Sequence, residues 1–174
     1  MDNFTPFRTF GTMLDCSRNA VPNLHALKKW VDLTASLGYN TLLLYTEDTY
    51  EVPDEPYFGY MRGRYSQAEL RELDAYAKKQ GMTIMPCIQT LAHLYAIKRW
   101  PEYWPHFDTD DILLAGDERV YTLIDHMFRS LAASLSCRTI HLGMDEAEMF
   151  ARGRYYNQHG DCNRSQVLLA HLQR

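Results

Sequence analysis

Two adjacent carboxylates end a short apolar run in the stretch Thr139-Ile140-His141-Leu142-Gly143-Met144-Asp145-Glu146. The run follows a helical pattern and is typical of a buried strand. Acids at the carboxyl end of a strand lie where α/β enzymes carry out their chemistry. Side chains alternate along a strand, so His141, Gly143 and Asp145 are expected to share one face. A backbone turn would then let both carboxylates approach one ligand, and Gly143 would leave room for it.

The acidic pair has an ordinary structural explanation as well. A helical pattern begins at Ala147, and Asp-Glu pairs are common at helix N-termini, where they interact favourably with the helix dipole. Asp145 could therefore be a helix cap, with no role in chemistry. The stretch alone favours neither interpretation, so the decision depends on the rest of the chain.

The same pattern of strand, polar residues and helix precedes this stretch three times. Strands are predicted at residues 9–14, 40–45 and 82–88, and helices follow from Asn23 to Gly38, from the capping box at Ser66 to Gly81, and over residues 121–135. One more helix is expected in the tail, starting near Asn163. The alternation predicts parallel β/α units in one α/β domain. Each predicted strand ends in polar residues, namely Asp15, Glu47-Asp48, Gln89 with His93, and Asp145-Glu146.

Composition restricts the classes of function. The chain has 174 residues, of which 46% are hydrophobic, and its formal net charge of −4 gives no footprint for nucleic acid or for an anionic membrane. It contains no apolar run near the roughly 20 residues of a membrane span, and its first residues lack the basic region of a secretory signal. We therefore expect a cytoplasmic protein whose four cysteines, far apart and without CxxC spacing, are buried free thiols.

The stretch 141–146 resembles the His-x-Gly-x-Asp-Glu signature of glycoside hydrolase family 20, the β-N-acetylhexosaminidases. Two other stretches agree with that family in order and spacing. Residues 11–18 resemble its first strand, usually Arg-Gly-x-x-x-Asp-x-Ser-Arg, and residues 85–93 resemble its third, usually Pro-Glu-x-Asp-x-Pro-Gly-His. The resemblance covers roughly residues 7–150, and three motifs in register make it specific.

The resemblance implies a (β/α)8 TIM barrel, of which residues 1–174 would be the amino-terminal part, truncated after about half of the catalytic domain. The isolated chain would then be inactive, because the strands that complete the sugar pocket are missing. A half barrel also exposes the inner face and the edges of its sheet. We therefore expect it to pair with a second copy, as a homodimer, or with the missing half.

For chemistry, the resemblance implies exo-hydrolysis of terminal N-acetylglucosamine or N-acetylgalactosamine, with no cofactor and no metal. The substrate's own 2-acetamido oxygen attacks the anomeric carbon, so no protein nucleophile is needed. Glu146 would be the general acid/base and Asp145 would orient the acetamido group. Three further residues would support the acid: His93, Asp48, which takes the place of the family's second-strand Asp by order along the chain, and His141 of the signature.

The sequence departs from the family at the sugar-binding positions. Phe10 stands where the family usually has an Arg that grips the outer hydroxyls of the sugar, and Arg8 or Arg18 would have to replace it beside Asp15. The family's usual Glu, Asp, Pro and Gly in the third motif are replaced here by Cys87, Gln89, Leu91 and Ala92. Three aromatic residues, Tyr57, Trp100 and Trp104, could form a platform for the rest of the glycan.

Three other functions fit parts of the sequence. The first is another barrel glycosidase with its acid on strand four and a protein nucleophile elsewhere. The second is a metal-dependent hydrolase built on His93, His141, Asp145 and Glu146, although the sequence lacks His-x-His and HExxH spacing. The third is a sugar-binding domain without catalysis, which would not require a proton donor in the acidic pair.

Overall fold

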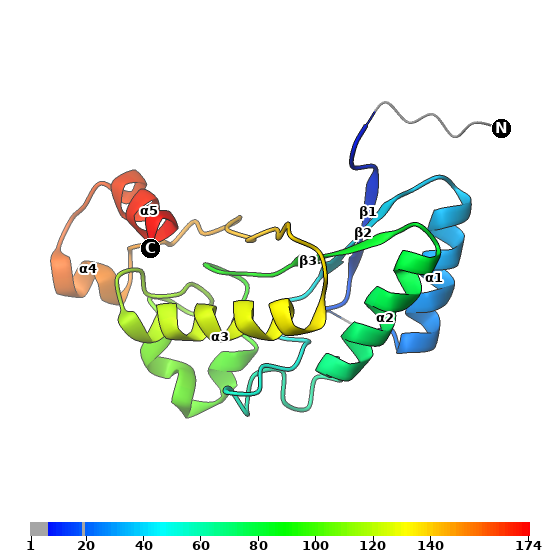
Figure 1. Cartoon of the computed structure of the whole chain (residues 1–174). Coiled ribbons are helices and arrows are strands. Elements are labelled where there is room, and N and C mark those ends of the chain that lie inside the picture. The colour runs from blue at the N-terminus through cyan, green and yellow to red at the C-terminus, as the bar shows by residue number, and fades with distance from the viewer. Residues whose placement is uncertain (1–6, 19) are drawn as a thin grey trace.

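A computed structural model describes residues 7–18 and 20–174 (Figure 1). Its elements follow the predicted alternation of strands and helices. They are β1 (Gly11–Asp15), α1 (Leu24–Ser36), β2 (Thr41–Tyr45), α2 (Gln67–Lys79), β3 (Thr83–Cys87), the 3-10 helices η1 (Ile97–Arg99) and η2 (Pro101–His106), α3 (Glu118–Ser134), α4 (Arg154–His159) and α5 (Arg164–Gln173).

The sheet has the order β1-β2-β3, and both pairs of strands are parallel. Its register places Met13, Leu43 and Met85 side by side on one face and Leu14, Leu44 and Pro86 on the other. The second face packs against α1, α2 and α3, which are drawn on one side of the sheet in Figure 1, and contributes Leu42, Leu44 and Ile84 to the core. The first face is open, and Met13 is 49% exposed.

The predicted fourth strand is reduced to a single parallel bridge between Cys87 and His141. Two main-chain hydrogen bonds hold it, from the His141 N–H to the Pro86 carbonyl and from the Ile88 N–H to the His141 carbonyl, each 3.0 Å long. Gly143 then turns away from the extended conformation with a φ of +55°. The segment does not continue as a strand because Gly143 interrupts the extended backbone two residues after the bridge.

Local signals in the sequence locate the helix starts. The Asn23 side chain accepts the Ala26 N–H at 2.9 Å and caps α1, and Ser66 and Glu69 form the predicted capping box of α2. Asp117 caps α3, which begins at Glu118, three residues before the predicted pattern. The tail differs from the prediction, because a short helix, α4, precedes the expected α5, which Asn163 caps. These caps satisfy N–H groups that a helix end otherwise leaves unpaired.

The four cysteines are free, as predicted, but only two of them are buried. Cys16 and Cys87 lie in the interior, whereas Cys137 and Cys162 are partly accessible. None of the helices in the described part of the chain is both long and apolar enough to cross a membrane.

Candidate active site

Three side chains from two loops meet where β3 and the bridged segment end. The His93 Nε2 atom lies 3.5 Å from a Glu146 carboxylate oxygen and 3.7 Å from one of Asp145. The two acids are 73% and 59% exposed, whereas the imidazole is only 16% exposed. A single, partly buried ring thus faces two accessible carboxylates, which are free to contact a ligand. This is the cluster that the sequence predicted from Asp145, Glu146 and His93.

The backbone at this cluster is in an uncommon conformation. His93 and Glu146 have φ angles of +59° and +53°, in the left-handed region that residues other than glycine rarely adopt. Such residues cost about 1–3 kcal/mol each and are concentrated at functional sites. The Thr90 N–H donates to the Leu142 carbonyl at 3.0 Å, and the Thr90 hydroxyl donates to the same oxygen at 2.9 Å. These bonds hold the two loops together and keep both residues in place.

No helix starts at Asp145, so the capping interpretation is wrong. Residues 148–152 form turns, and the next helix, α4, begins only at Arg154. The helical pattern predicted from Ala147 is not realised. Asp145 therefore has no helix N-terminus to cap, and its carboxylate remains directed to the cluster with His93.

Gly143 has a different role from the expected one. A Cβ atom at this position would lie 2.0 Å from the Ile88 carbonyl oxygen and 2.7 Å from the Gln89 side chain. The residue is buried, so it does not open space for a ligand. It allows the chain to pass directly over the end of β3, and its positive φ turns Asp145 and Glu146 toward His93.

His141 lies on the open face of the sheet beside Cys87. Its Nδ1 atom accepts the Gly143 N–H at 3.2 Å and lies 3.2 Å from the Cys87 sulfur. Because Nδ1 is an acceptor, a neutral His141 carries its proton on Nε2. Burial raises the pKa of Cys87 to about 11, and the charge of Asp145 acts in the same direction. The thiol therefore stays protonated near neutral pH and is no nucleophile.

Sequence order assigned the second-strand acid to Asp48, but in the structure Asp48 pairs with Arg62, whereas its neighbour Glu47 contacts Tyr45 on the open face of the sheet. Asp48 is buried and accepts a hydrogen bond from Arg62 Nε at 3.1 Å. Glu47 is buried on the other side of the chain, and the Tyr45 hydroxyl lies 3.3 Å from its Oε1 atom. Burial raises the pKa of Glu47, while the nearby charges of Arg18 and His93 oppose that shift. The charge of His93 thus acts on the Glu47 carboxyl, whereas the Asp48 carboxylate pairs with Arg62.

The alternation of side chains along β2 could have identified Glu47, which the assignment by order along the chain did not. Leu43 and Tyr45 face the open side of the sheet, and the same period of two continues to residue 47. By the same rule Gln89 follows Met85 and Cys87. Its Nε2 group donates to the Tyr45 hydroxyl at 3.0 Å, and its Oε1 atom is buried without a partner among the described residues. A chain of polar contacts therefore joins Gln89, Tyr45 and Glu47 beneath the cluster.

Comparison with known proteins identifies the family. Residues 6–170 match the sequence model described as "Glycosyl hydrolase family 20, catalytic domain". The chain belongs to this family. β-Hexosaminidases of Vibrio furnissii and Akkermansia muciniphila are each 28% identical to it, over 80% and 79% of its length. The chain spans 29% and 34% of the lengths of those two relatives.

Solved family 20 structures have the same fold. An exo-β-N-acetylglucosaminidase of Vibrio harveyi, in complex with N-acetylglucosamine, matches with a TM-score of 0.80 at 22% identity and covers 93% of this chain and 32% of its own. The β-N-acetylhexosaminidase of Streptomyces coelicolor matches with a TM-score of 0.79 at 20% identity, over 97% of this chain and 36% of its own. The predicted fold class, parallel β/α units of a TIM barrel, is confirmed.

The family's first-strand positions are divided between the two ends of β1. At the carboxyl end, Asp15 accepts hydrogen bonds from the Ser17 N–H and hydroxyl, both at 2.8 Å, and pairs with Arg18. The Arg18 guanidinium lies 5.4 Å from the centre of the Tyr45 ring, which places it near Glu47. Partial burial opposes ionisation of Asp15, but these hydrogen bonds and the Arg18 charge lower its pKa overall.

Arg8 lies at the other end of β1. Its carbonyl accepts the Asn40 side-chain amide at 3.1 Å, and Asn40 directly precedes β2. Phe10, which replaces the family's Arg, stacks on Tyr39 with ring centres 4.5 Å apart. The structure therefore brings Arg18 and Asp15 to the carboxyl end of the sheet, and it places Arg8 at the amino end.

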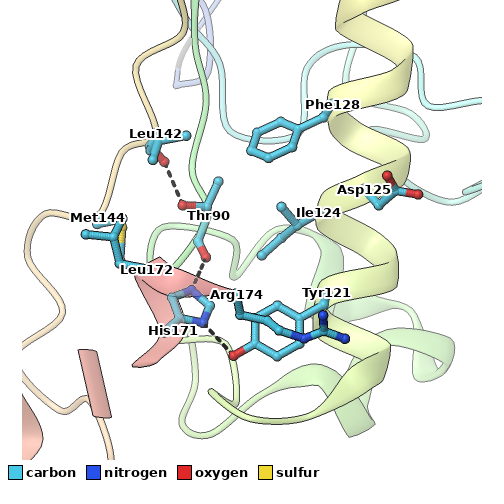
Figure 2. A pocket seen from close by; sticks show the side chains of 10 residues that line it. All are labelled: Thr90, Tyr121, Ile124, Asp125, Phe128, Leu142, Met144, His171, Leu172 and Arg174. Atoms are coloured by element: carbon cyan, nitrogen blue, oxygen red, sulfur yellow. Dashed lines mark hydrogen bonds between the residues drawn. The ribbon is translucent and has the colours of Figure 1, made fainter. Parts of the chain in front are cut away.

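A hollow of about 280 Å³ lies on the helix side of the molecule, between α3, α5 and Leu142 (Figure 2). His171 closes one end, since its Nε2 lies 3.0 Å from the Thr90 carbonyl and its Nδ1 lies 3.2 Å from the Tyr121 hydroxyl. Burial lowers the pKa of His171, which favours the neutral ring. Neither Asp145 nor Glu146 lines this hollow, so it is separate from the acidic cluster. Among the described residues, no group of three His, Cys, Asp or Glu is arranged to hold a metal.

Proposed function

We propose that the protein is an exo-β-N-acetylhexosaminidase that removes terminal N-acetylglucosamine or N-acetylgalactosamine with retention of configuration. The observation that carries this proposal is the adjacent pair Asp145 and Glu146, both accessible and both within 3.7 Å of one imidazole. The relatives named above support the substrate class. An adjacent pair suits a mechanism in which the substrate supplies the nucleophile, because a protein nucleophile would have to reach the opposite face of the sugar.

In the first step, the Glu146 carboxyl donates its proton to the glycosidic oxygen as the bond from that oxygen to the anomeric carbon breaks. The 2-acetamido oxygen forms a new bond to the same carbon and gives an oxazolinium ion. Asp145 accepts the acetamido N–H and stabilises the positive charge. In the second step, the Glu146 carboxylate removes a proton from water, which attacks the anomeric carbon and reopens the ring.

His93 and Glu47 are proposed to position the acid. His93 lies within 3.7 Å of both carboxylates, and its charge acts on the buried Glu47 carboxyl. We propose that Glu47 has the supporting role that chain order gives to Asp48. Arg18, held by Asp15, is the candidate for binding the outer hydroxyls of the sugar.

Inhibition by mechanism-based ligands tests this mechanism. A thiazoline mimic of the cyclised N-acetyl sugar is expected to inhibit competitively, because it resembles the oxazolinium intermediate. A 2-fluoro sugar is expected to leave no covalent label. Labelling by the fluoro sugar without inhibition by the thiazoline would instead identify a protein nucleophile. Binding of N-acetylglucosamine without turnover of any glycoside would favour a sugar-binding domain.

Separate substitutions of the two neighbouring acids, Glu47 and Asp48, test the role of Glu47. We expect Glu47→Gln to lower kcat/KM about 10- to 100-fold, the range for loss of a charged hydrogen-bonding partner. Asp48→Asn is the matched control and should leave kcat/KM nearly unchanged, while it weakens the contact with Arg62 and destabilises the fold by about 1–3 kcal/mol. The opposite ranking in kcat/KM would return the supporting role to Asp48.

The Glu47 variant should also change how stability depends on pH. Burial raises the pKa of Glu47, so the folded protein holds its proton at pH values where the unfolded chain, with a pKa of about 4.3, has lost it. Wild-type stability therefore falls as pH rises from about 4 through the raised pKa. Glu47→Gln has no such titration, so its free energy of unfolding should increase relative to that of the wild type as pH rises. Urea titrations at several pH values measure the difference.

We further propose that the 174-residue chain is inactive by itself, because the exposed acids and the open face of the sheet leave the pocket without a second wall. It is expected to turn over an aryl β-N-acetylglucosaminide no faster than its Glu146→Gln variant. Pairing with a second copy or with the rest of a barrel would cover Met13. Glu146-dependent turnover by a monomer, established by sedimentation in the same buffer, would contradict this.

A further inference from the structure

Thr90 is the residue at which the two loops of the acidic cluster are joined. Its N–H lies 3.0 Å from the Leu142 carbonyl oxygen and 3.2 Å from that of Gly143. Thr90 comes three residues before His93, and Leu142 comes three residues before Asp145. Thr90 is buried, so its remaining polar group, the main-chain carbonyl, needs a hydrogen-bond partner within the protein.

His171 on α5 is the partner of that carbonyl. Its Nε2 atom lies 3.0 Å from the Thr90 oxygen, and its Nδ1 atom lies 3.2 Å from the Tyr121 hydroxyl (Figure 2). A carbonyl oxygen only accepts, so the neutral ring carries its proton on Nε2 and accepts the Tyr121 hydroxyl at Nδ1. That hydroxyl in turn accepts the Gly116 N–H at 3.0 Å. Both nitrogens of the ring are therefore used, and each bond has a fixed direction.

The α5 helix buries a histidine and leaves its leucines exposed. His171 is the one residue of α5 that is buried. The exposed leucines are Leu168, Leu169 and Leu172. Burial of an imidazole costs free energy unless its nitrogens are hydrogen-bonded, whereas a leucine would only have to pack. The contact of α5 with the loop of Thr90 thus depends on a directional bond.

The bond from His171 fixes the backbone that leads to His93. It holds the plane of the peptide between Thr90 and Leu91, and the next carbonyl, that of Leu91, accepts the Leu113 N–H at 2.7 Å. His93 follows with its φ of +59°, a conformation that persists only where the surrounding structure holds it. Loss of the first of these two bonds would therefore let the His93 imidazole move relative to the two acids.

We propose that His171 is a positioning residue for the glycosidase reaction, holding the loop of His93 beside the loop of Glu146 through the Thr90 carbonyl. It acts from the helix side of the sheet, because the hollow that it closes is lined by neither Asp145 nor Glu146. A small displacement of the acid from the glycosidic oxygen weakens proton donation. This inference rests on the proposed function of the acidic pair.

Kinetics with two aryl β-N-acetylglucosaminides test the inference, in the longest form of the protein that its gene encodes. One substrate has an acidic phenol as its leaving group, and the other has a weakly acidic phenol that needs more protonation. His171→Phe keeps a ring and removes both hydrogen bonds. It is expected to lower kcat/KM about tenfold for the weakly acidic phenol and about threefold or less for the acidic one, because misplacement removes part of general acid catalysis.

Two further variants separate positioning from stability. The amide of His171→Gln can donate to the Thr90 carbonyl, so its kcat/KM should return to within about threefold of the wild type. Val31→Ala is the control for stability, since Val31 is fully buried in α1, at the other end of the molecule from α5 in Figure 1. It should lower the melting temperature and leave the ratio of the two kcat/KM values unchanged.

Three results would overturn the inference. They are unchanged kinetics in His171→Phe, an equal loss on both substrates, and a change of the ratio in Val31→Ala that matches the change in His171→Phe. If His171→Phe does not fold, His171→Asn takes its place, because the shorter amide does not reach the Thr90 carbonyl.

Amide hydrogen exchange separates failure of the inference from failure of the proposed function. If the wild type cleaves neither substrate, the proposed function fails. Faster exchange of the Thr90 N–H in His171→Phe, and not in Val31→Ala, would then still show that His171 holds the two loops together. Equal exchange of that N–H in wild type and His171→Phe would overturn the inference as well.

Discussion

Glu146→Gln is expected to lower kcat/KM for an aryl β-N-acetylglucosaminide by about 10²- to 10⁴-fold, the range for loss of a general acid/base. Gln has nearly the shape of Glu but cannot donate a proton to the glycosidic oxygen or accept one from water. The carboxylate is 73% exposed and makes its one described ion-pair contact, at 3.5 Å, with His93. Folding should therefore change little, so that the loss reports on chemistry.

The dependence on the leaving group sharpens this experiment. Departure of an acidic phenol needs little protonation, so the first step should suffer less in Glu146→Gln with such a substrate than with a sugar leaving group. The matched control is Glu148→Gln, two residues further along the same turn, where the side chain is exposed. It should retain wild-type kinetics. Equal losses in both variants, or near-normal turnover by Glu146→Gln, would remove Glu146 from the mechanism. Cleavage of a plain aryl β-glucoside would point to a protein nucleophile.

Gly143→Ala is expected to be the most destabilising small substitution near the site. The new Cβ atom would lie 2.0 Å from the Ile88 carbonyl oxygen and collide with it. The alanine residue would also have to adopt a φ of +55°. The left-handed conformation costs about 1–2 kcal/mol and overpacking about 1–3 kcal/mol. We expect a total loss of about 3 kcal/mol, which lowers the melting temperature of a protein of this size by about 6–12 °C. Displacement of the following turn should also reduce activity.

The control for this substitution separates backbone strain from collision. Gly81→Ala forces a similar φ, +73°, at a position where a Cβ atom meets nothing within 4 Å. It is expected to cost only the conformational part, about 1–2 kcal/mol. Calorimetric melting curves of the two variants give the difference. Equal melting temperatures would mean that the end of β3 can move away from Gly143, contrary to the close packing described here.

Local patterns in the sequence predicted much of the framework. The run Thr41–Tyr45 and the helix caps at Asn23 and Ser66 identified their elements to within a residue or two. Their signals depend on neighbouring residues, such as a side-chain oxygen that accepts a nearby N–H group or a period of 3.6 against one of 2. The tail was less well predicted, because nothing in its weak pattern separated α4 from α5.

The sequence by itself predicted the alternation of strands and helices and the cluster of Asp145, Glu146 and His93. Spacing and motif order can be read along the chain without knowing which residues meet in space. Only the tertiary structure decided that Asp48 pairs with Arg62 while Glu47 contacts Tyr45, where Arg8 lies and why residue 143 is a glycine. Glu47 and Asp48 are neighbours in the chain but lie on opposite sides of it, and the need for Gly143 comes from Ile88, 55 residues earlier. Such choices depend on which backbones meet at the end of the sheet, and composition, spacing and local propensity do not record that.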